Sequence, residues 1–332
     1  MSRSLAAELE ELLLVPAYSS RWAHASIAAH RSLSFPLQLA GQARRRTIST
    51  GAGTFEILEL GREKLTAVIG DRLFGPLPTA RQEARRLALS PAALKETDAD
   101  LVIAEVHRWM ASRFRRDGWL IVPRSVRWHG DLTTVPPAAP SKSLQANLAK
   151  LRKQNFSLVQ ANSQDDWQEF YTTMVEPQAK ARHGSAAWVA SYPFLRKVAE
   201  KGTLHFIVEN GVRVAGLCTI PHGDTLWFPL MGMRQGDPGL LQRGASVAAI
   251  ALPIEWARRK NYRFIDLGRT GSFVNDGLQR YKRRWGFVPV PDPLSLVTAV
   301  WIGSAEARAT FAREPVLVET DAGLETYAGE VR

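Results

Sequence analysis

The sequence of 332 residues lacks several features that would each have assigned it to a class of protein. It has a single cysteine, Cys218, which excludes an internal disulfide and a zinc site made of several cysteines. It also has no His-Glu-x-x-His motif, no phosphate-binding loop ending in Gly-Lys and no Gly-x-Ser-x-Gly motif. We therefore expect neither a metal cofactor nor a serine nucleophile, and low cysteine content favours a reducing, cytoplasmic compartment.

Long hydrophobic runs are missing as well. The longest apolar stretches, 245–254 and 294–304, fall short of the roughly 18 residues that a membrane helix needs. Near the start, Glu8, Glu10 and Glu11 stand where a signal peptide would carry basic residues. The sequence thus predicts neither a transmembrane segment nor export.

The chain is rich in positive charge. It has 43 Lys or Arg against 32 Asp or Glu, a formal net charge of +11. A basic surface attracts polyanions such as nucleic acids, nucleotide cofactors or acidic glycans, although an arginine-rich composition alone gives the same balance. The cations gather in four clusters, at 44–46, 142–153, 258–263 and 280–284.

Composition and a proline-rich segment divide the chain into four parts. We expect a helical or extended segment at 1–50, a first α/β domain at 51–140, a second at 141–304 and a loosely docked acidic tail at 305–332. Three prolines in 136–140 predict a linker between the domains, although a rigid loop inside one domain has the same composition.

In the first domain, alternation over 54–60 predicts a strand. Asp98 or Asp100 can cap a helix that continues to Arg116. Residues 119–128 then form a predicted strand, with Pro123 at an edge or bulge. From this strand, Arg124 and Arg127 are weak candidates for substrate contact.

The second domain shows a clear alternation of elements. It is predicted to contain helices and strands in this order: a helix capped by Ser143, a strand at 156–161, helices at 165–180 and 193–201, strands at 204–209 and 212–220 joined by a hairpin turn at Asn210-Gly211, a strand at 226–233, a long helix at 240–260 kinked or split at Pro253, a strand at 263–267, a helix at 276–285 and a strand at 287–290.

Three segments of this domain resemble a known family. They are Ser-Leu-Gln-Ala-Asn-Leu-Ala-Lys-Leu-Arg-Lys at 143–153, Phe-Ile-Asp-Leu-Gly-Arg at 264–269 and Gly-Leu-Gln-Arg-Tyr-Lys-Arg-Arg-Trp-Gly at 277–286. Together with the element order, they resemble the FemAB-like acyltransferases of the GNAT fold. The resemblance covers residues 141–291 and is weak before residue 95.

This resemblance implies an α/β (α+β) fold of tandem GNAT-like domains, with mixed central sheets flanked by helices and a degenerate first domain. It also implies transfer of an acyl group to an amine. Some family members use aminoacyl-tRNA to extend peptidoglycan precursors, and relatives linked to polysaccharide synthesis use an acyl-CoA. The implied partners are an acyl donor, an amine-bearing acceptor and, for some members, tRNA.

Lys282 is the strongest catalytic candidate from the residues themselves. At 100° per residue, Lys282 falls between Leu278 and Trp285 on the apolar side of its helix, while three arginines share the other side. A buried lysine must be paired, directed outward or functional. The resemblance implies that its ammonium stabilises the tetrahedral oxyanion of acyl transfer, and Tyr281 lies beside it. A lysine at the helix edge with no function is the alternative.

Asp266 and Arg269 lie at the end of a predicted strand. Asp266 can orient the attacking amine or pair with Lys282, and Arg269 can bind a phosphate or carboxylate. An Asp–Arg pair that only fixes the loop is the alternative.

The segment between the strand at 226–233 and the long helix has the place at which a GNAT fold binds the pyrophosphate of CoA. Its candidate donor-binding residues are Arg234, Gln235, Gly236, Gly239 and Gly244. The neighbouring Asp237 is unfavourable beside phosphate and the spacing departs from the GNAT pattern, so acyl-CoA and aminoacyl-tRNA both remain open as donors.

Three further residues are candidates for contact with the substrate. Asn147 lies in the basic helix, Tyr171 lies on a helix that lines the acceptor site in GNAT-like folds, and His183 follows that helix in a predicted loop. Packing or an ordinary surface position is the alternative for each. The sequence thus predicts transfer of an acetyl or aminoacyl group to an amine of a cell-envelope, polysaccharide or peptide acceptor. A non-catalytic protein that binds RNA or an anionic glycan on a degenerate GNAT scaffold is the second hypothesis.

Overall fold

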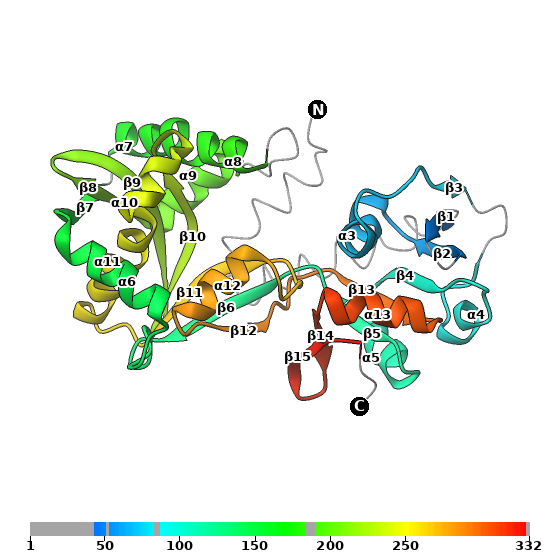
Figure 1. Ribbon diagram of the computed structural model, residues 1–332. Coiled ribbons are helices and arrows are strands. Elements are labelled where there is room, and N and C mark those ends of the chain that lie inside the picture. Colours follow the sequence, from blue (N-terminus) through cyan, green and yellow to red (C-terminus); the bar gives the residue numbers. More distant parts are fainter. Residues whose placement is uncertain (1–42, 51–52, 83–86, 162, 184–189, 330–332) are drawn as a thin grey trace. The chain divides into compact units, whose positions relative to one another are not determined.

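The computed structural model describes residues 43–50, 53–82, 87–161, 163–183 and 190–329. These residues form two units, each built on a mixed sheet with helices on both faces, as the α/β prediction required (Figure 1). Unit 1 contains Trp128–Gly268 and Tyr281–Val288. Unit 2 contains the described residues up to Arg127, together with Arg269–Arg280 and those from Pro289 onward.

The sheet of unit 1 has seven strands in the order β12-β6-β11-β10-β9-β8-β7. They are β6 (Val126–Asp131), β7 (Phe156–Ala161), β8 (Thr203–Glu209), β9 (Val212–His222), β10 (Thr225–Met233), β11 (Phe264–Thr270) and β12 (Val288–Pro291). The helical segments are α6 (Lys142–Lys153), α7 (Gln164–Glu169), the π-helix η1 (Phe170–Val175), α8 (Glu176–His183), α9 (Tyr192–Lys201), the 3-10 helix η3 (Arg234–Gly236), α10 (Pro238–Arg243), α11 (Ala245–Arg259) and α12 (Gly277–Arg284).

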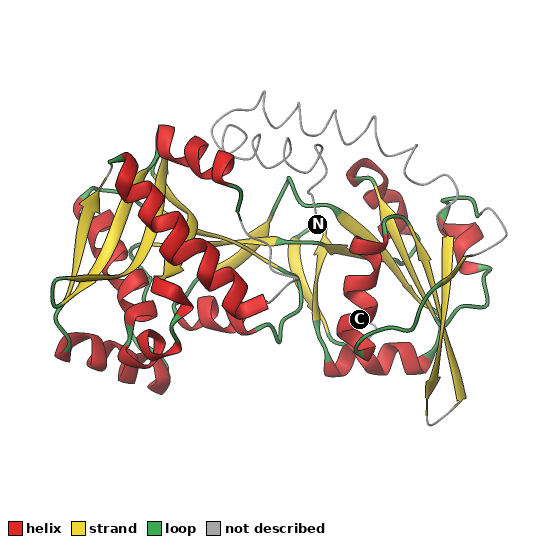
Figure 2. Cartoon of the chain, turned by 90° about the horizontal axis from the view of Figure 1, so that it is seen from above, coloured by secondary structure: helices red, strands yellow, loops and turns green. Residues whose placement is uncertain are grey.

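Helices cover both faces of this sheet, as Figure 2 also shows. On one face, Phe170 of η1 and Val198 of α9 share a core cluster with Phe206 of β8. The next side chain back along β8, His205, points to the opposite face and lies 4.7 Å from Trp256 of α11, measured between ring centroids. The period of two along β8 therefore places α9 and α11 on opposite sides of the sheet.

The sheet of unit 2 has six strands in the order β3-β1-β2-β4-β13-β5, beside a separate hairpin, β14-β15. The strands are β1 (Ala43–Thr50), β2 (Gly53–Leu60), β3 (Arg81–Gln82), β4 (Leu101–Val106), β5 (Leu120–Pro123), β13 (Val297–Ile302), β14 (Val316–Thr320) and β15 (Gly323–Tyr327). The helices are α3 (Glu63–Phe74), α4 (Pro91–Lys95), α5 (Arg108–Arg116) and α13 (Ala305–Arg313). Alternate residues of β2 and β4 join two core clusters, one with α3 and α13 and the other with α4 and α5.

The prediction of one helix from Asp98 or Asp100 to Arg116 is wrong in its first half. Residues 101–106 form the central strand β4, which pairs in parallel with β2 and antiparallel with β13, and all six residues are buried. A strand buried on both faces is a continuous apolar run, which periodicity alone does not separate from a helix. The helix α5 begins only after His107, whose imidazole accepts from the amide of Trp109.

The course of the chain between the sheets also differs from the expected boundaries. The predicted strand 119–128 is two strands, since β5 belongs to the sheet of unit 2 and β6 to the sheet of unit 1. The proline segment 136–140 lies inside unit 1, so the alternative of a rigid loop within one domain holds. Residues 297–302 pair with β4 and β5 and thus belong to unit 2, not to the second domain.

The C-terminal segment is folded rather than loosely docked. Its residues form α13, β14 and β15, and its carboxylates pair with arginines of unit 2. Arg108 donates to both carboxylate oxygens of Glu319 at 3.0 Å. Most of the predicted helical or extended segment 1–50 lies outside the described residues, except for 43–50, which form β1.

Two predictions about helix boundaries need correction. The long helix is not split at Pro253, which lies inside α11, but at Gly244, whose left-handed backbone (φ 101°) ends α10 and begins α11. The basic helix α6 is capped by Ser141 and not by Ser143, because the hydroxyl of Ser141 accepts from the amide of Leu144 at 3.4 Å.

Candidate functional site

The strands β10 and β11 separate at the middle of the sheet of unit 1. In the described chain their parallel pairing is limited to Thr225–Trp227 against Phe264–Asp266. A bulge in β10 begins at Trp227, where its register with β9 shifts. The ladder with β10 therefore ends at Asp266, inside β11, and we call the segment 266–268 at this point the β11 terminus.

Asp266 organises the backbone of the β11 terminus. Its side chain is fully buried, and Oδ1 accepts a hydrogen bond from the amide of Gly268 at 2.7 Å. Gly268 has φ +70°, a conformation that strains any residue with a Cβ, so glycine suits this turn. The other carboxylate oxygen, Oδ2, lies 3.4 Å from Nε2 of His129 on β6.

Lys282 reaches the same segment from α12. The side chain is 4% exposed, which confirms the prediction that this lysine points to the inner side of its helix. Its ammonium donates to the carbonyl of Leu267 at 2.9 Å and to that of Gly268 at 3.3 Å. The side-chain nitrogen of Lys282 is thereby fixed at the β11 terminus, within unit 1 and away from bulk water.

The other inward residues of α12 differ from the helical-wheel expectation. Leu278 is 44% exposed, whereas Gln279 is fully buried and donates to the carbonyl of Gly271 at 2.6 Å. Tyr281 is half-buried, and its hydroxyl donates to the carbonyl of Ser246 at 2.9 Å, which ties α12 to the first turn of α11. Trp285 is buried, as expected, and its ring lies 6.4 Å from that of Tyr281.

Arg269 is engaged within unit 2. Its guanidinium forms a two-pronged ion pair with Asp292, with a distance of 3.2 Å from the terminal nitrogen to Oδ1. Asp292 is 1% exposed and also accepts from the hydroxyl of Ser125 at 3.1 Å. This geometry matches the alternative in which an Asp–Arg pair fixes the loop, although the partner is Asp292 and not Asp266.

The predicted donor-binding residues follow β10. Arg234 pairs with Glu169 and donates to the carbonyl of Arg213, so its guanidinium holds η3 against its neighbours. Gln235 and Gly236 both have positive φ, and a Cβ at Gly236 would lie 2.8 Å from that of Ala181 in α8. These contacts explain the residue types of η3 by local packing.

The start of α11 is more open. Asp237 caps the short helix α10 by accepting from the amide of Gly239 at 2.7 Å. Gly244 is itself buried, yet a Cβ built on it would meet no atom within 4 Å. The backbone at the first turn of α11 thus borders unfilled space, while Tyr281 reaches it from α12.

The three predicted substrate contacts are not brought to the β11 terminus by any contact of the described residues. Asn147 is half-buried in α6. Tyr171 belongs to the π-helix, and its ring packs edge-on against Tyr192 with centroids 5.3 Å apart. His183 is the last residue of α8 rather than part of a loop, and its side chain lies outside the described part of the structure.

The π-helix η1 packs unusually closely on the sheet. Gly216 of β9 and Gly232 of β10 are paired in register, and both lie beneath η1. A Cβ at Gly232 would lie 2.6 Å from the carbonyl carbon of Met174, and one at Gly216 would lie 2.6 Å from the ring of Phe170. Because neither glycine has a side chain, the π-helix, which is wider than an α-helix, can pack directly on β9 and on β10, the strand that leads to the site.

Two buried groups of unit 1 lie apart from the β11 terminus. Burial raises the pKa of Cys218 to about 12, which agrees with an inert thiol inside the core. Burial lowers the pKa of His205 to about 4, and its Nε2 lies 3.1 Å from the hydroxyl of Thr219. Both side chains are engaged inside the core, Cys218 with the carbonyl of Leu230 and His205 with Thr219 and Trp256.

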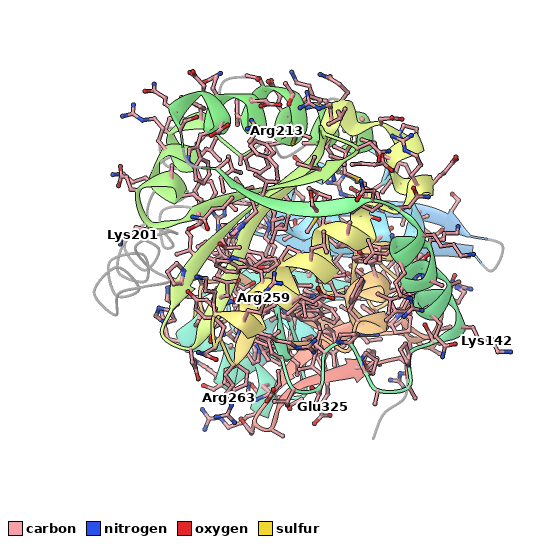
Figure 3. The ribbon with its side chains drawn as sticks, turned by 90° about the vertical axis from the view of Figure 1, so that its left-hand side faces the viewer. Lys142, Lys201, Arg213, Arg259, Arg263 and Glu325 are labelled. Atoms are coloured by element: carbon pink, nitrogen blue, oxygen red, sulfur yellow. The ribbon has the colours of Figure 1, made fainter. Side chains whose placement is uncertain are left out.

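The basic clusters differ in their use. Arg46 is buried and pairs with Glu59 at 2.8 Å, and Arg258 donates to the carbonyl of Leu132 at 3.0 Å, so both stabilise the fold. Arg283 lies 5.7 Å from the ring of Trp128, and burial lowers its pKa. The cations of α6 are exposed instead: Lys142, Lys150, Arg152 and Lys153. Figure 3 shows Lys142 at one end of this helix, directed outward.

His129 is the residue of this site that sequence reasoning missed. His129 alternates with Arg127 and Asp131 along β6, but the predicted strand ended one residue earlier. Its role depends on Asp266, which is 137 positions away in the sequence and becomes a neighbour only when β6 and β11 pair.

Searches for a metal site and a membrane helix gave negative results for the described residues. No group of three or more His, Cys, Asp or Glu is placed to hold a metal ion there. None of the helices within the described ranges is long and apolar enough to cross a membrane.

Comparison with known proteins finds no matching family model and no matching curated protein. Several solved structures are similar over most of the chain, at low sequence identity. L-PGS from Bacillus licheniformis has a TM-score of 0.43 and 13% identity, covering 87% of this chain and 91% of its own. The C-terminal domain of a putative lysylphosphatidylglycerol synthetase from Agrobacterium fabrum has a TM-score of 0.40 and 13% identity, covering 86% and 94%.

FemX is similar at a TM-score of 0.39 and 9% identity, covering 78% of this chain and 88% of its own. A GCN5-related N-acetyltransferase from Anabaena variabilis has a TM-score of 0.32 and 10% identity, covering 86% and 70%.

Proposed function

We propose that this chain is an acyltransferase that moves an acetyl or aminoacyl group from an activated donor to an amine. The observation that carries the proposal is the ammonium of Lys282, buried and held at the β11 terminus where β10 and β11 separate. A neutral donor would satisfy the two carbonyls that Lys282 contacts. A buried full charge is costly to fold, so its presence is best explained by a transient negative charge that it stabilises.

The reaction follows from the charge. The amine nitrogen attacks the carbonyl carbon of the donor, a C–N bond forms, and the electrons of the C=O bond move to the oxygen. Lys282 then faces an oxyanion in a site with little water, where a fixed charge acts strongly. When the intermediate collapses, the C–S bond of a thioester or the C–O bond of an aminoacyl ester breaks, and the leaving group takes up a proton.

The other predicted residues have supporting roles in this proposal. Asp266 fixes the turn at Gly268 and so sets the direction of the carbonyls that hold Lys282. Tyr281 anchors α12, the helix that carries Lys282, on the first turn of α11. The first turn of α11, with the open position at Gly244, is the proposed approach for the donor. Both acyl-CoA and aminoacyl-tRNA remain donors in the proposal, with a cell-envelope, polysaccharide or peptide amine as acceptor.

A donor screen tests this proposal. The full chain is mixed separately with acetyl-CoA, longer acyl-CoAs and aminoacyl-tRNA, and both the melting temperature and donor consumption are measured with and without a panel of amines. A donor at 100 times its dissociation constant stabilises the folded chain by about 2.7 kcal/mol. We expect one donor class to stabilise the chain and to be consumed only when an amine is present. If none is consumed faster than in protein-free controls, the chain is not an acyltransferase.

A second function is supported by the exposed cations of α6. Four cations without an intervening acid form a surface that suits an anionic polymer, as expected for a non-catalytic RNA- or glycan-binding protein. Uncharged tRNA is the probe that separates the two. Binding that weakens steeply with salt, is lost when Lys150, Arg152 and Lys153 are changed to Gln, and occurs without any transfer would favour the binding protein.

A further inference from the structure

His129 and Lys282 meet the β11 terminus from two different elements. Lys282 contacts the carbonyls of Leu267 and Gly268, and His129 faces the carboxylate of Asp266, one residue earlier. His129 and Lys282 therefore contact neighbouring residues of one short segment.

The environment of His129 is asymmetric. Asp266 is fully buried, whereas the side chain of His129 is 36% exposed. Nε2, which faces Asp266, is inaccessible to water. One side of the imidazole therefore faces a buried carboxylate, and the rest of the side chain is partly exposed to solvent.

This arrangement selects a tautomer. A carboxylate accepts hydrogen bonds and cannot donate them, so Nε2 carries the hydrogen that faces Asp266. The lone pair of the neutral ring is then on Nδ1, the nitrogen farther from Asp266. A carboxylate behind an imidazole also stabilises the ring when it gains a proton, as in the catalytic arrangements of many hydrolases.

We propose that His129 is the general base of the transfer reaction, with Asp266 as its positioning residue. This inference rests on the proposed acyltransferase function. Nδ1 takes one proton from the acceptor's ammonium and so frees the lone pair that attacks the carbonyl carbon, and the carbonyl electrons move to the oxygen that faces Lys282. As the donor's C–S or C–O bond breaks, the second proton of the nitrogen passes to the thiolate or alkoxide, and His129 releases the first proton to solvent. No other reactant is required.

A purely structural role of His129 and a role as general base predict different results for the same substitution. If His129 serves only to satisfy Asp266, any donor in its place preserves activity. Glutamine provides an N–H for Asp266 but accepts no proton at neutral pH, so His129→Gln separates the two roles. His222→Gln is the matched control, because His222 is exposed at the end of β9 and belongs to no part of the site.

The experiment compares two amines with acetyl-CoA as the donor, and a parallel series uses alanyl-tRNA. Nα-acetyl-lysine is an alkylamine that is protonated at neutral pH and needs a base. Hydroxylamine is largely unprotonated and attacks without one. For each protein, the rate with each amine is measured above the protein-free rate, together with KM for the donor and the melting temperature.

General-base assistance contributes 10²–10⁴-fold to a rate. We expect His129→Gln to lower kcat with Nα-acetyl-lysine by at least about 100-fold and the rate with hydroxylamine by less than about fivefold, with an unchanged KM for the donor. His222→Gln should match the wild type with both amines. Equal losses with the two amines, or no loss with either, overturn the role of His129 while leaving the transferase intact. A wild type that transfers to neither amine from either donor refutes the proposed function itself, and His129 with it.

Discussion

Removal of the charge of Lys282 is the perturbation whose two effects can be calculated separately. Lys282→Gln keeps a donor of similar length for the carbonyls of Leu267 and Gly268, and Lys282→Met keeps the length alone. In the proposed mechanism both variants lose the stabilised oxyanion. Loss of one such interaction raises the activation free energy by about 3 kcal/mol, which is a rate decrease of about 150-fold.

Stability should respond differently to the two variants. Methionine leaves two buried carbonyls without the donor that they have in the wild type, at about 1–3 kcal/mol each. It also removes the desolvation of an ammonium that is 4% exposed, which offsets part of that loss. We therefore expect Lys282→Met to lower the free energy of unfolding by about 2 kcal/mol, and Lys282→Gln to lower it by about half as much.

The assay combines transfer rates at saturating donor with urea unfolding followed by tryptophan fluorescence. Arg284→Gln is the control, because Arg284 is exposed on the same helix and its loss removes the same charge. The decisive variant is Lys282→Gln, which should be folded yet slow. A Lys282→Gln enzyme with a rate within threefold of the wild type would show that Lys282 serves only the backbone.

Three further predictions concern stability. Burial lowers the pKa of His205 to about 4 in the folded chain, against about 6.5 in the unfolded chain. The free energy of unfolding should therefore fall by about 3 kcal/mol as the pH drops from 6.5 to 4. Urea unfolding of His205→Gln at several pH values should lack this contribution to the pH dependence. Gly232→Ala should lower the free energy of unfolding by about 3 kcal/mol, because the added Cβ would lie 2.6 Å from the main chain of the π-helix. In the control Gly277→Ala the added Cβ meets nothing within 4 Å, so the free energy of unfolding, followed through the melting temperature, should change by no more than about 1 kcal/mol. Arg269→Met leaves the carboxylate of Asp292, 1% exposed, without its ion pair and should cost about 3 kcal/mol, measured by denaturant unfolding; an unchanged midpoint would show that the pair is not a stabilising contact.

Local patterns predicted the parts of this fold that depend on neighbours in sequence. The hairpin at Asn210-Gly211 and the strands β10 and β11 follow from turn residues and apolar runs, and the structure places them as expected. The inward direction of Lys282 follows from the period of its helix. Each of these inferences needs only residues within about ten positions of one another.

The errors occurred where distant segments decide the structure. The strand β4 is stabilised by β13, nearly 200 residues later, so its own sequence does not distinguish a buried strand from a helix. The same pairing brings residues 297–302 into unit 2 and makes the boundary at 304 misleading. In the site, Arg269 takes Asp292 as its partner and Asp266 takes His129, and neither pairing is visible in the local sequence.

The geometry of the β11 terminus separates what the backbone requires from what chemistry requires. Where the ladder with β10 ends, the amide of Gly268 and the carbonyls of Leu267 and Gly268 bond to side chains, those of Asp266 and Lys282. Neutral side chains would satisfy these backbone groups without the cost of burying two charges. In the proposed acyl transfer each of these groups has a use: Lys282 faces the developing oxyanion, and Asp266 positions His129. Backbone satisfaction alone therefore explains why polar residues occur here, but not why they are ionic.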